Sequence, residues 1–356
     1  MGRHPRVRPL SRRPTVTVVV PCFNYGHYLP LAVASALDQP GVDVDVIVVD
    51  DASTDGSGSV ARDLAAADER VRAVLRARNR GHIATYNDGL EQATGEFVVL
   101  LSADDALARG CLARATALMV AVPTVAFTYG FPMEFSDHLP AGGTRVRSWT
   151  VWAGPEWVAK RCERGANCIH CPEVVMRTSV QHAIGGYDPG LPHSGDMEMW
   201  MRAALTGDVG RVNGPVQGYY RVHDRSMQRT VFAGHMTDLN ARLAAFDKVL
   251  VRSEARPPNA ERLFARARLA LARHAVAYGW AAFHHGRERL EPVDEYLAFA
   301  ERVWPAARGW RRWRAMAQCP AGGSPLSGHP VARLGRGAVM DLTGRVRWRR
   351  WRWSGQ

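Results

Sequence analysis

The chain has 356 residues, of which 46% are hydrophobic and 22% are charged. A chain of this length and composition can bury a sizeable core, which excludes a disordered protein and a small disulfide-bonded one. The net charge is +12, but five arginines in each of the acid-free segments 1–13 and 345–356 account for ten of those charges. The body between these segments is nearly neutral, which argues against a nucleic-acid-binding face on the fold.

The sequence predicts a bacterial, cytoplasmic protein. No stretch reaches the roughly 18 uninterrupted apolar residues that a spanning helix needs, and arginines and prolines stand where a secretory signal requires an apolar segment. The six cysteines are irregularly spaced, as expected of reduced thiols in a large protein. Lys160 and Lys248 are the only lysines among 46 basic residues, a bias typical of a high-GC genome.

From Thr15 onward, β-branched runs alternate with alanine-rich segments at helical spacing. The runs predict strands over 16–20, 44–49, 71–75, 97–101 and 125–129, and the segments between them predict helices over 28–38, 56–67, 84–93 and 110–120. Because the apolar residues of the strands are consecutive rather than alternating, both faces of the sheet should be covered. This indicates an α/β fold with a mostly parallel sheet flanked by helices.

The second half of the chain changes in character. Residues 131–170 lack periodicity, after which a strand over 173–177, a helix over 196–206 and a strand over 216–221 complete the α/β body. Alanine, arginine and leucine at helical spacing then predict two to four helices, and Gly, Pro and Ser dominate the end. We therefore expect a basic disordered tail over 1–14, a catalytic domain over 15–232, a helical appendage over 233–318 and a flexible tail over 319–356.

Polar residues follow three of the predicted strands. The segments are Pro21–Tyr25 (PCFNY), Asp50–Ser57 (DDASTDGS) and Ser102–Asp105 (SADD). Because the carboxyl ends of parallel strands meet at one edge, these segments should line a single crevice. Asp50 and Asp51 can hydrogen-bond a nucleobase or ribose, and Phe23 offers a face for stacking on the base.

Other residues of these segments allow two interpretations. Ser53, Asp55 and Ser57 could serve the ligand or cap the helix that opens at Gly56. Asp104 and Asp105 can hold a divalent ion that neutralises a diphosphate leaving group, or belong to a turn or a helix cap.

In order and spacing, these segments resemble the nucleotide-sugar-binding half of the family 2 glycosyltransferases, which have the Rossmann-like GT-A fold. The matching segments are Val16–Asn24, Val46–Ser57, Asn79–Gly81 with Asn87, Gly95–Glu96, Leu100–Asp105, Gly185–Asp188, Gly195–Asp196 with Trp200 and Arg202, and Tyr220–His223. The resemblance covers about residues 15–228 and leaves the C-terminal helical appendage outside it.

The resemblance implies a site for a nucleoside-diphosphate sugar, of the UDP, GDP or dTDP type. In that site Phe23 stacks on the base and Asp51 reads the base edge. The residues predicted to bind the donor are Pro21, Phe23, Asn24, Asp50, Asp51, Arg80 and Asp104.

The resemblance also implies a divalent metal, Mn²⁺ or Mg²⁺. Asp104 and Asp105 take the place of the family's acidic metal-binding motif, in which Ser102 stands where the first acid of the common D-x-D form belongs. We expect His223, which follows a returning strand, to contact the metal or the diphosphate. A structural histidine is the alternative.

Asp196 is the predicted catalytic base. Inverting sugar transfer needs a carboxylate that takes the proton of the acceptor hydroxyl as its oxygen attacks the anomeric carbon. The family supplies this carboxylate from an acidic pair before a helix, which is reduced to Gly195-Asp196 here. An N-cap is the alternative interpretation of Asp196, Glu198 is the second candidate acid, and Trp200 could be an acceptor platform or a core residue.

The cysteine-rich segment 162–171 could suggest zinc, but no second ligand pair completes a set of four. We expect Cys162, Cys168 and Cys171 to be free thiols in a loop on the acceptor side.

The leading hypothesis is an inverting glycosyltransferase acting on a hydroxyl acceptor in cell-envelope polysaccharide, glycolipid or natural-product glycosylation. The main alternative is a non-catalytic nucleotide- or membrane-binding scaffold, and a nucleic-acid-binding role of the tails is a third, weaker idea.

The segment 345–353 interleaves three tryptophans with five arginines, and the run 304–314 is similar in composition. Tryptophan prefers the headgroup level of a bilayer and arginine is attracted to anionic lipid, so we expect peripheral contact with the inner face of the plasma membrane. A disordered end without a partner is the alternative.

Overall fold

The structure is a computed structural model that describes residues 2–169, 171–227, 230, 234–285 and 292–318. The chain forms two compact units. The first comprises residues 1–158 and 169–224, and the second comprises residues 159–168 and 225–356.

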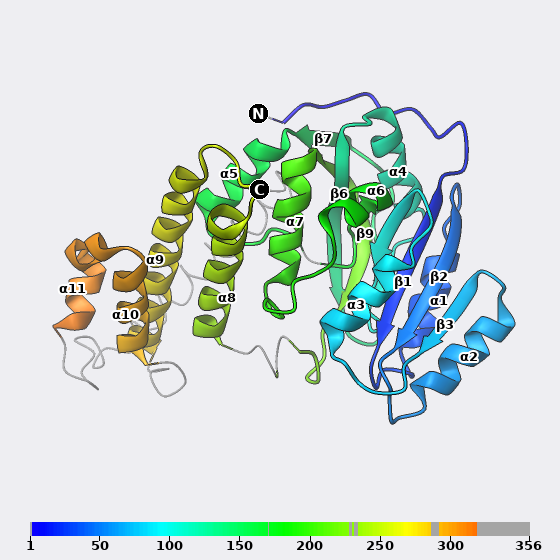
Figure 1. Ribbon diagram of the computed structural model, residues 1–356, viewed down its shortest axis with the longest axis horizontal. Coiled ribbons are helices and arrows are strands. Elements are labelled where there is room, and N and C mark those ends of the chain that lie inside the picture. The colour runs from blue at the N-terminus through cyan, green and yellow to red at the C-terminus, as the bar shows by residue number, and fades with distance from the viewer. Residues whose placement is uncertain (1, 170, 228–229, 231–233, 286–291, 319–356) are drawn as a thin grey trace. The chain divides into compact units, whose positions relative to one another are not determined.

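The first unit is built on a sheet with the strand order β3-β2-β1-β4-β8-β6-β9-β5, in which β7 also pairs with β9 (Figure 1). Neighbours among β3, β2, β1 and β4 are parallel, β8 is antiparallel to β4 and β6, and β6 is parallel to β9. The bounds are β1 Thr15–Cys22, β2 Asp43–Asp50, β3 Val71–Leu75, β4 Phe97–Leu100, β5 Ala106–Leu107, β6 Val125–Phe135, β7 Ser148–Trp152, β8 Val175–Arg177 and β9 Asp208–Arg221.

The centre of the sheet is apolar on both faces, as the consecutive valines predicted. Val18, Val19 and Val20 of β1 are fully buried. The register pairs Thr15 with Asp43 and Cys22 with Asp50, so β1 and β2 end side by side. The polar segments after these strands therefore start from the same edge of the sheet, as predicted.

Helices cover both faces of this sheet (Figure 1). Helices α1 and α2 pack against each other and against β2, whereas α3 packs on β1, β2 and β4. Because the β3–α3–β4 connection runs back across the sheet, its right-handed crossover places α3 on the opposite face. The bounds are α1 Leu29–Leu37, α2 Ser57–Ala67, α3 His82–Glu91, α4 Cys111–Ala121, α5 Gly154–Arg164, α6 Thr178–Ile184 and α7 Gly195–Thr206.

Helix α3 lies unusually close to the sheet because residue 89 is glycine. A Cβ atom at Gly89 would stand 2.2 Å from a methyl carbon of Val19 and 3.2 Å from one of Val49. The absence of a side chain thus sets the depth of α3, which carries several residues of the site described below.

The structure differs from the sequence prediction in several places, among them the early start of β9 at Asp208 and the unpredicted helix α6. Strand β7 and helix α5 lie in the segment 131–170, where no periodicity pointed to them. The predicted disordered tail over 1–14 is tied to the sheet instead: Arg3 exchanges two backbone hydrogen bonds with Val151 and pairs with Asp208 at 2.6 Å. This segment also forms the ion pairs Arg12–Glu96 and Arg13–Asp43.

The elements of the second unit given below are helical, and α9 packs against both α8 and α10. Its elements are α8 His235–Asp247, η1 Lys248–Arg252, α9 Ala260–His285, α10 Val293–Val303, η2 Pro305–Gly309 and α11 Arg311–Ala317. In the part of the chain that the structure describes, no helix combines the length and apolar character needed to cross a membrane. The tryptophan- and arginine-rich segment 345–353 lies outside the described residues.

Candidate active site

The loops that follow β1 and β2 are tied together by Asn24. This residue adopts a left-handed backbone conformation (φ +58°), which asparagine tolerates better than most residues. Its N–H donates to Ser53 Oγ at 2.9 Å, and its side-chain oxygen accepts the N–H of Thr54 at 2.8 Å. Next to it the ring of Phe23 is 46% exposed, as a surface for stacking on a base requires.

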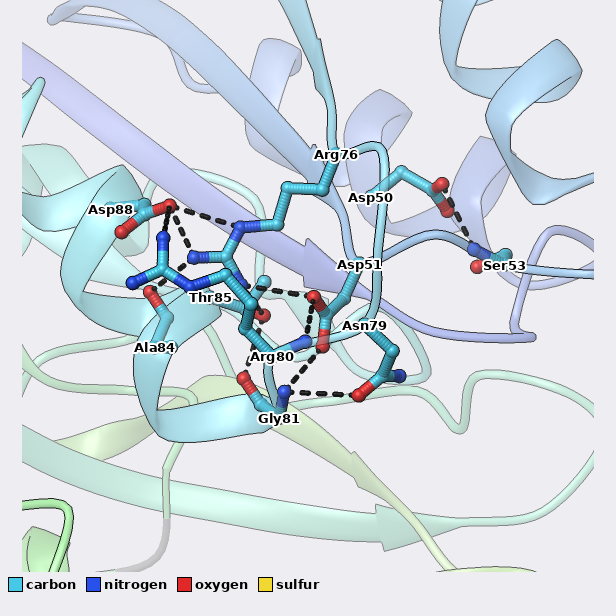
Figure 2. Close-up of polar contacts among 10 residues, drawn as sticks. All are labelled: Asp50, Asp51, Ser53, Arg76, Asn79, Arg80, Gly81, Ala84, Thr85 and Asp88. Atoms are coloured by element: carbon cyan, nitrogen blue, oxygen red, sulfur yellow. Dashed lines mark hydrogen bonds and ion pairs between the residues drawn. The ribbon is translucent and has the colours of Figure 1, made fainter.

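Asp51 forms the centre of a buried network (Figure 2). Its Oδ1 accepts hydrogen bonds from Arg76 Nη1 and the N–H of Arg80, both at 2.9 Å, and its Oδ2 accepts the N–H of Gly81 at 2.9 Å. The side chains of Asp51 and Arg76 are only 3% and 7% exposed. Three protein donors thus occupy most of the accepting capacity of this carboxylate.

Arg76 connects Asp51 to helix α3. Its guanidinium also pairs with Asp88, and it donates to Thr85 Oγ1 at 3.1 Å and to the carbonyl of Ala84 at 3.2 Å (Figure 2). Burial by itself lowers the pKa of Arg76, but the hydrogen bonds with Asp88 and Asp51 raise it overall. Arg76 was not among the predicted site residues, because nothing in its local sequence distinguishes it from the many other arginines.

Asp50 differs from its neighbour. One oxygen, Oδ2, accepts the N–H of Ser53 at 3.2 Å. The other, Oδ1, is buried and has no hydrogen-bond partner among the described residues. Since a buried carboxylate oxygen is costly to leave unsatisfied, Asp50 is better placed than Asp51 to accept a hydrogen bond from a ligand.

Asp55 binds the first residue of helix α2, although the N-cap of this helix is Gly56. Its Oδ1 accepts the N–H of Ser57 at 2.9 Å and the hydroxyl of the same residue. Desolvation raises the pKa of Asp55, but the hydrogen bonds from Ser57 and Gly26 lower it overall. Asp55 is therefore part of the scaffold beneath the crevice.

The acidic segment after β4 is held by one arginine of β9. The N–H of Arg221 donates to Asp105 Oδ1 at 2.8 Å, and its Nε donates to the carbonyl of Asp104 at 2.8 Å. The guanidinium lies between the rings of Tyr28 and Phe135, at 4.4 and 4.3 Å from their centroids. Arg221 belongs to the segment Tyr220–His223 that carries the sequence resemblance, but its partners are seen only in the folded chain.

The two acids of this segment have different environments. Asp105 is 2% exposed, and burial together with the neighbouring charge of Asp104 raises its pKa well above the usual carboxyl range. Asp104 is more accessible, and its Oδ2 lies 3.0 Å from Nε2 of His223. The His223 ring is itself held between Tyr25 and Tyr28, with both ring centroids at 5.6 Å.

The structure brings two of the three predicted metal ligands together. Asp104 and His223 offer a hard oxygen and an imidazole nitrogen side by side, whereas Asp105 already accepts a backbone N–H. Within the described ranges no three His, Cys, Asp or Glu side chains form a complete metal-binding group. The donor set therefore fits a metal whose remaining ligands are diphosphate oxygens and water.

Asp196 lies in the first turn of α7, where a helix N-terminus favours negative charge. It is not the N-cap, because that position belongs to Ser194. The hydroxyl of Tyr187 donates to Asp196 Oδ1 at 2.9 Å, and the Cys171 thiol forms a second hydrogen bond with the carboxylate. Burial raises the pKa of Asp196, although these two hydrogen bonds partly offset that rise.

Two other candidates on α7 have structural roles. The carboxylate of Glu198 is buried and is bound by Arg202 at 2.7 and 2.8 Å, so it is not available as a base. Trp200 is 3% exposed and packs against Phe127, with 5.7 Å between ring centroids. It therefore belongs to the core rather than to an acceptor platform.

The described cysteines are free thiols, as expected. Cys162 lies in helix α5, however, and not in a loop as predicted. Cys162 and Cys168 are buried and Cys171 is partly exposed. His170, which the zinc alternative invoked, lies outside the described residues.

Solved structures with the same architecture define the fold. A mannosyltransferase from Pyrobaculum calidifontis, in complex with GDP-Man and Mn²⁺, superposes with a TM-score of 0.56 and 22% identity over 87% of this chain and 84% of that one. A TarS fragment from S. aureus, in complex with UDP-GlcNAc, gives a TM-score of 0.59 and 16% identity over 85% of this chain and 88% of that one. The chain thus has the GT-A fold of glycosyltransferases, as predicted.

Sequence comparison finds a family match in part of the chain. Residues 17–167 match the profile of Glycosyl transferase family 2. The GalNAc(5)-diNAcBac-PP-undecaprenol beta-1,3-glucosyltransferase of Campylobacter jejuni is 39% identical over 100 residues, which are 28% of this chain and 32% of that relative. Two other curated relatives are matched over 51% and 40% of their own lengths, so the chain spans about half of them or less.

The network around Asp51 gives a stability prediction. Replacing Arg76 with alanine leaves the buried Asp51 without its counter-charge, while Asp88 keeps a longer contact with Arg80, so the free energy of unfolding should fall by about 3–5 kcal/mol. The control is Arg109→Ala, which removes an exposed ion pair with Asp38 and should cost less than about 1 kcal/mol. Urea denaturation measures both, and equal losses in the two variants would contradict the role given to Arg76.

Proposed function

We propose that the chain is an inverting glycosyltransferase that moves a sugar from a nucleoside diphosphate to an acceptor hydroxyl. The observation that carries this proposal is the position of the candidate base relative to the acidic segment. Tyr86 packs against Tyr187, whose hydroxyl donates to Asp196. The pKa of Tyr86 is raised by burial and by the carboxylates of Asp196 and the acidic segment. We therefore take Asp196 and the acidic segment to face the same substrates.

The donor side of the crevice suits a nucleotide. Phe23 offers the exposed ring on which the base stacks, and the unsatisfied Oδ1 of Asp50 is an acceptor for a base or ribose donor. The Arg80 side chain is 55% exposed beside this loop and can reach an anionic group, while Asn24 holds the loops in register.

Asp104 and His223 are the residues that would hold a divalent ion, which when bound supplies positive charge to the departing diphosphate. Arg221 fixes the backbone of the acidic segment, so Asp104 is oriented before the donor arrives. Asp105, which is buried and accepts the N–H of Arg221, supports this turn, and burial raises its pKa.

Asp196 carries the acid–base step. Its carboxylate takes the proton of the acceptor hydroxyl while that oxygen forms a bond to the anomeric carbon. The bond from that carbon to the diphosphate oxygen breaks on the opposite face, and the configuration inverts. Because burial raises the pKa of Asp196, the carboxylate is more basic than an exposed one.

The relatives indicate a range of substrates without selecting one. The names of the solved enzymes include a GDP-linked and a UDP-linked sugar, and the Campylobacter enzyme is named for a lipid-linked saccharide acceptor. We propose an envelope glycan, a lipid-linked saccharide or a natural product as the acceptor class here.

The base assignment predicts a specific loss. Asp196→Asn should lower the turnover number by ~10²–10⁴-fold and leave nucleotide affinity nearly unchanged, because a general base acts on the acceptor. The matched control is Asp43→Asn. Asp43 lies at the start of β2, away from the strand end that carries Asp50 and Asp51, so this variant should retain wild-type turnover. Transfer assays on a panel of nucleotide sugars and calorimetry with UDP and GDP measure the two effects. Nucleotide binding without transfer or donor hydrolysis in the wild type would favour the scaffold alternative.

The metal assignment predicts a different effect. Asp104→Asn should abolish the gain in nucleotide affinity that Mn²⁺ gives, whereas Asp105→Asn should reduce it less, because Asp105 is buried and already accepts the N–H of Arg221. Calorimetry with and without Mn²⁺ tests this order. If Mn²⁺ leaves the affinity of wild type and Asp104→Asn the same, the metal site is disproved.

We further propose that the segment 345–353 contacts an anionic membrane surface, on the basis of its composition alone. Sedimentation with anionic and neutral vesicles should show binding to the anionic ones that is lost on deletion of residues 345–356. Equal binding to both kinds of vesicle would rule out electrostatic anchoring by this segment.

A further inference from the structure

Tyr187 has no role in the proposed reaction, but it contacts the proposed base Asp196 directly. Its side chain is 3% exposed, and its hydroxyl donates to Asp196 Oδ1 at 2.9 Å. A buried hydroxyl that donates to a carboxylate stabilises the ionised form of that carboxylate and fixes its orientation.

The backbone of Tyr187 is held in turn by helix α3. The side-chain amide of Asn87 donates to the Tyr187 carbonyl at 2.9 Å and accepts the Tyr187 N–H at 2.7 Å. This two-sided contact requires glycine at position 186, where a Cβ atom would lie 2.4 Å from the Asn87 side-chain oxygen. The phenol ring is packed from the other side by Tyr86, with 5.4 Å between ring centroids.

Four other titratable groups interact with Asp196. They are Cys171 in the loop before β8, Tyr86 and His82 on α3, and His193 before α7. Burial raises the pKa values of Cys171, Tyr86 and Tyr187 well above their usual ranges. All three groups therefore keep their protons at neutral pH, and Tyr187 remains a hydrogen-bond donor while Asp196 ionises.

We propose that Tyr187 is a positioning residue that orients the Asp196 carboxylate and keeps it ionised, with Asn87 of α3 holding Tyr187 in place. This inference rests on the proposed function, because it assumes that Asp196 is the base. It assigns a task to the Asn87 and Gly185–Asp188 segments, which the sequence singled out and the proposed reaction leaves without one.

The Tyr187 hydrogen bond should shift the pH dependence of turnover in one direction. The active form of Asp196 is deprotonated, so the turnover number falls as pH drops through its pKa. The Tyr187 hydrogen bond favours the charged form and lowers that pKa against the effect of burial. Without it, protonation of Asp196 and loss of activity should begin at a higher pH.

The test is Tyr187→Phe, which removes one oxygen and keeps the ring. The acid limb of the turnover profile should move upward by about one pH unit, with nucleotide affinity unchanged. Tyr86→Phe is the matched control, because it removes a hydroxyl one ring away that makes no hydrogen bond to Asp196 among the described contacts. Its acid limb should coincide with that of the wild type.

A second substitution keeps the proposal falsifiable if Tyr187→Phe does not fold. Replacing Tyr187 alone with 3-fluorotyrosine makes the hydroxyl a stronger donor, and should move the acid limb downward. An unchanged acid limb in the folded variants would overturn the positioning role while Asp196→Asn remained inactive. If Asp196→Asn itself retained full activity, the assignment of the base would fail instead, so the two failures are distinguishable.

Discussion

The buried ion pair between Arg76 and Asp51 is the interaction on which the donor side of the molecule depends. Two charged groups that are almost fully removed from water are stable together only because each is satisfied by further hydrogen bonds. Asp51 obtains them from the backbone at Arg80 and Gly81, and Arg76 obtains them from α3. The pair therefore fixes the loop between β3 and α3 against the end of β2.

Helix α3 links the two halves of the proposed reaction. Thr85 and Asp88 bind Arg76 and so support the donor loops, while Asn87 on the same helix holds Tyr187 against Asp196. The close packing at Gly89 sets the position of this helix on the sheet. One rigid element thus sets the positions of groups that must act on a donor and on an acceptor at the same time.

The pattern of burial gives neighbouring acids different tasks. Asp50 has one oxygen without a hydrogen-bond partner among the described residues, whereas Asp51 accepts hydrogen bonds from the protein on both oxygens. Asp104 is partly exposed, whereas Asp105 is buried and accepts the N–H of Arg221. The sequence presents each pair as two equivalent carboxylates. Their division of labour follows from the hydrogen bonds that each receives in the fold, which local sequence does not encode.

The sequence by itself determined the α/β class, the central strands and the sheet edge at which the polar segments start, because consecutive valines require burial on both faces and parallel strands end at one edge. Through its resemblance it also pointed to the family and to Asp196. Only the tertiary structure decided what holds these groups: Arg76, Tyr187 and Arg221 act on partners 25, 9 and 116 residues away. It also tied down the N-terminal arginines, since their carboxylate partners Glu96 and Asp208 come from distant parts of the chain. Such contacts depend on which distant segments the fold brings together, and local sequence patterns do not predict those pairings.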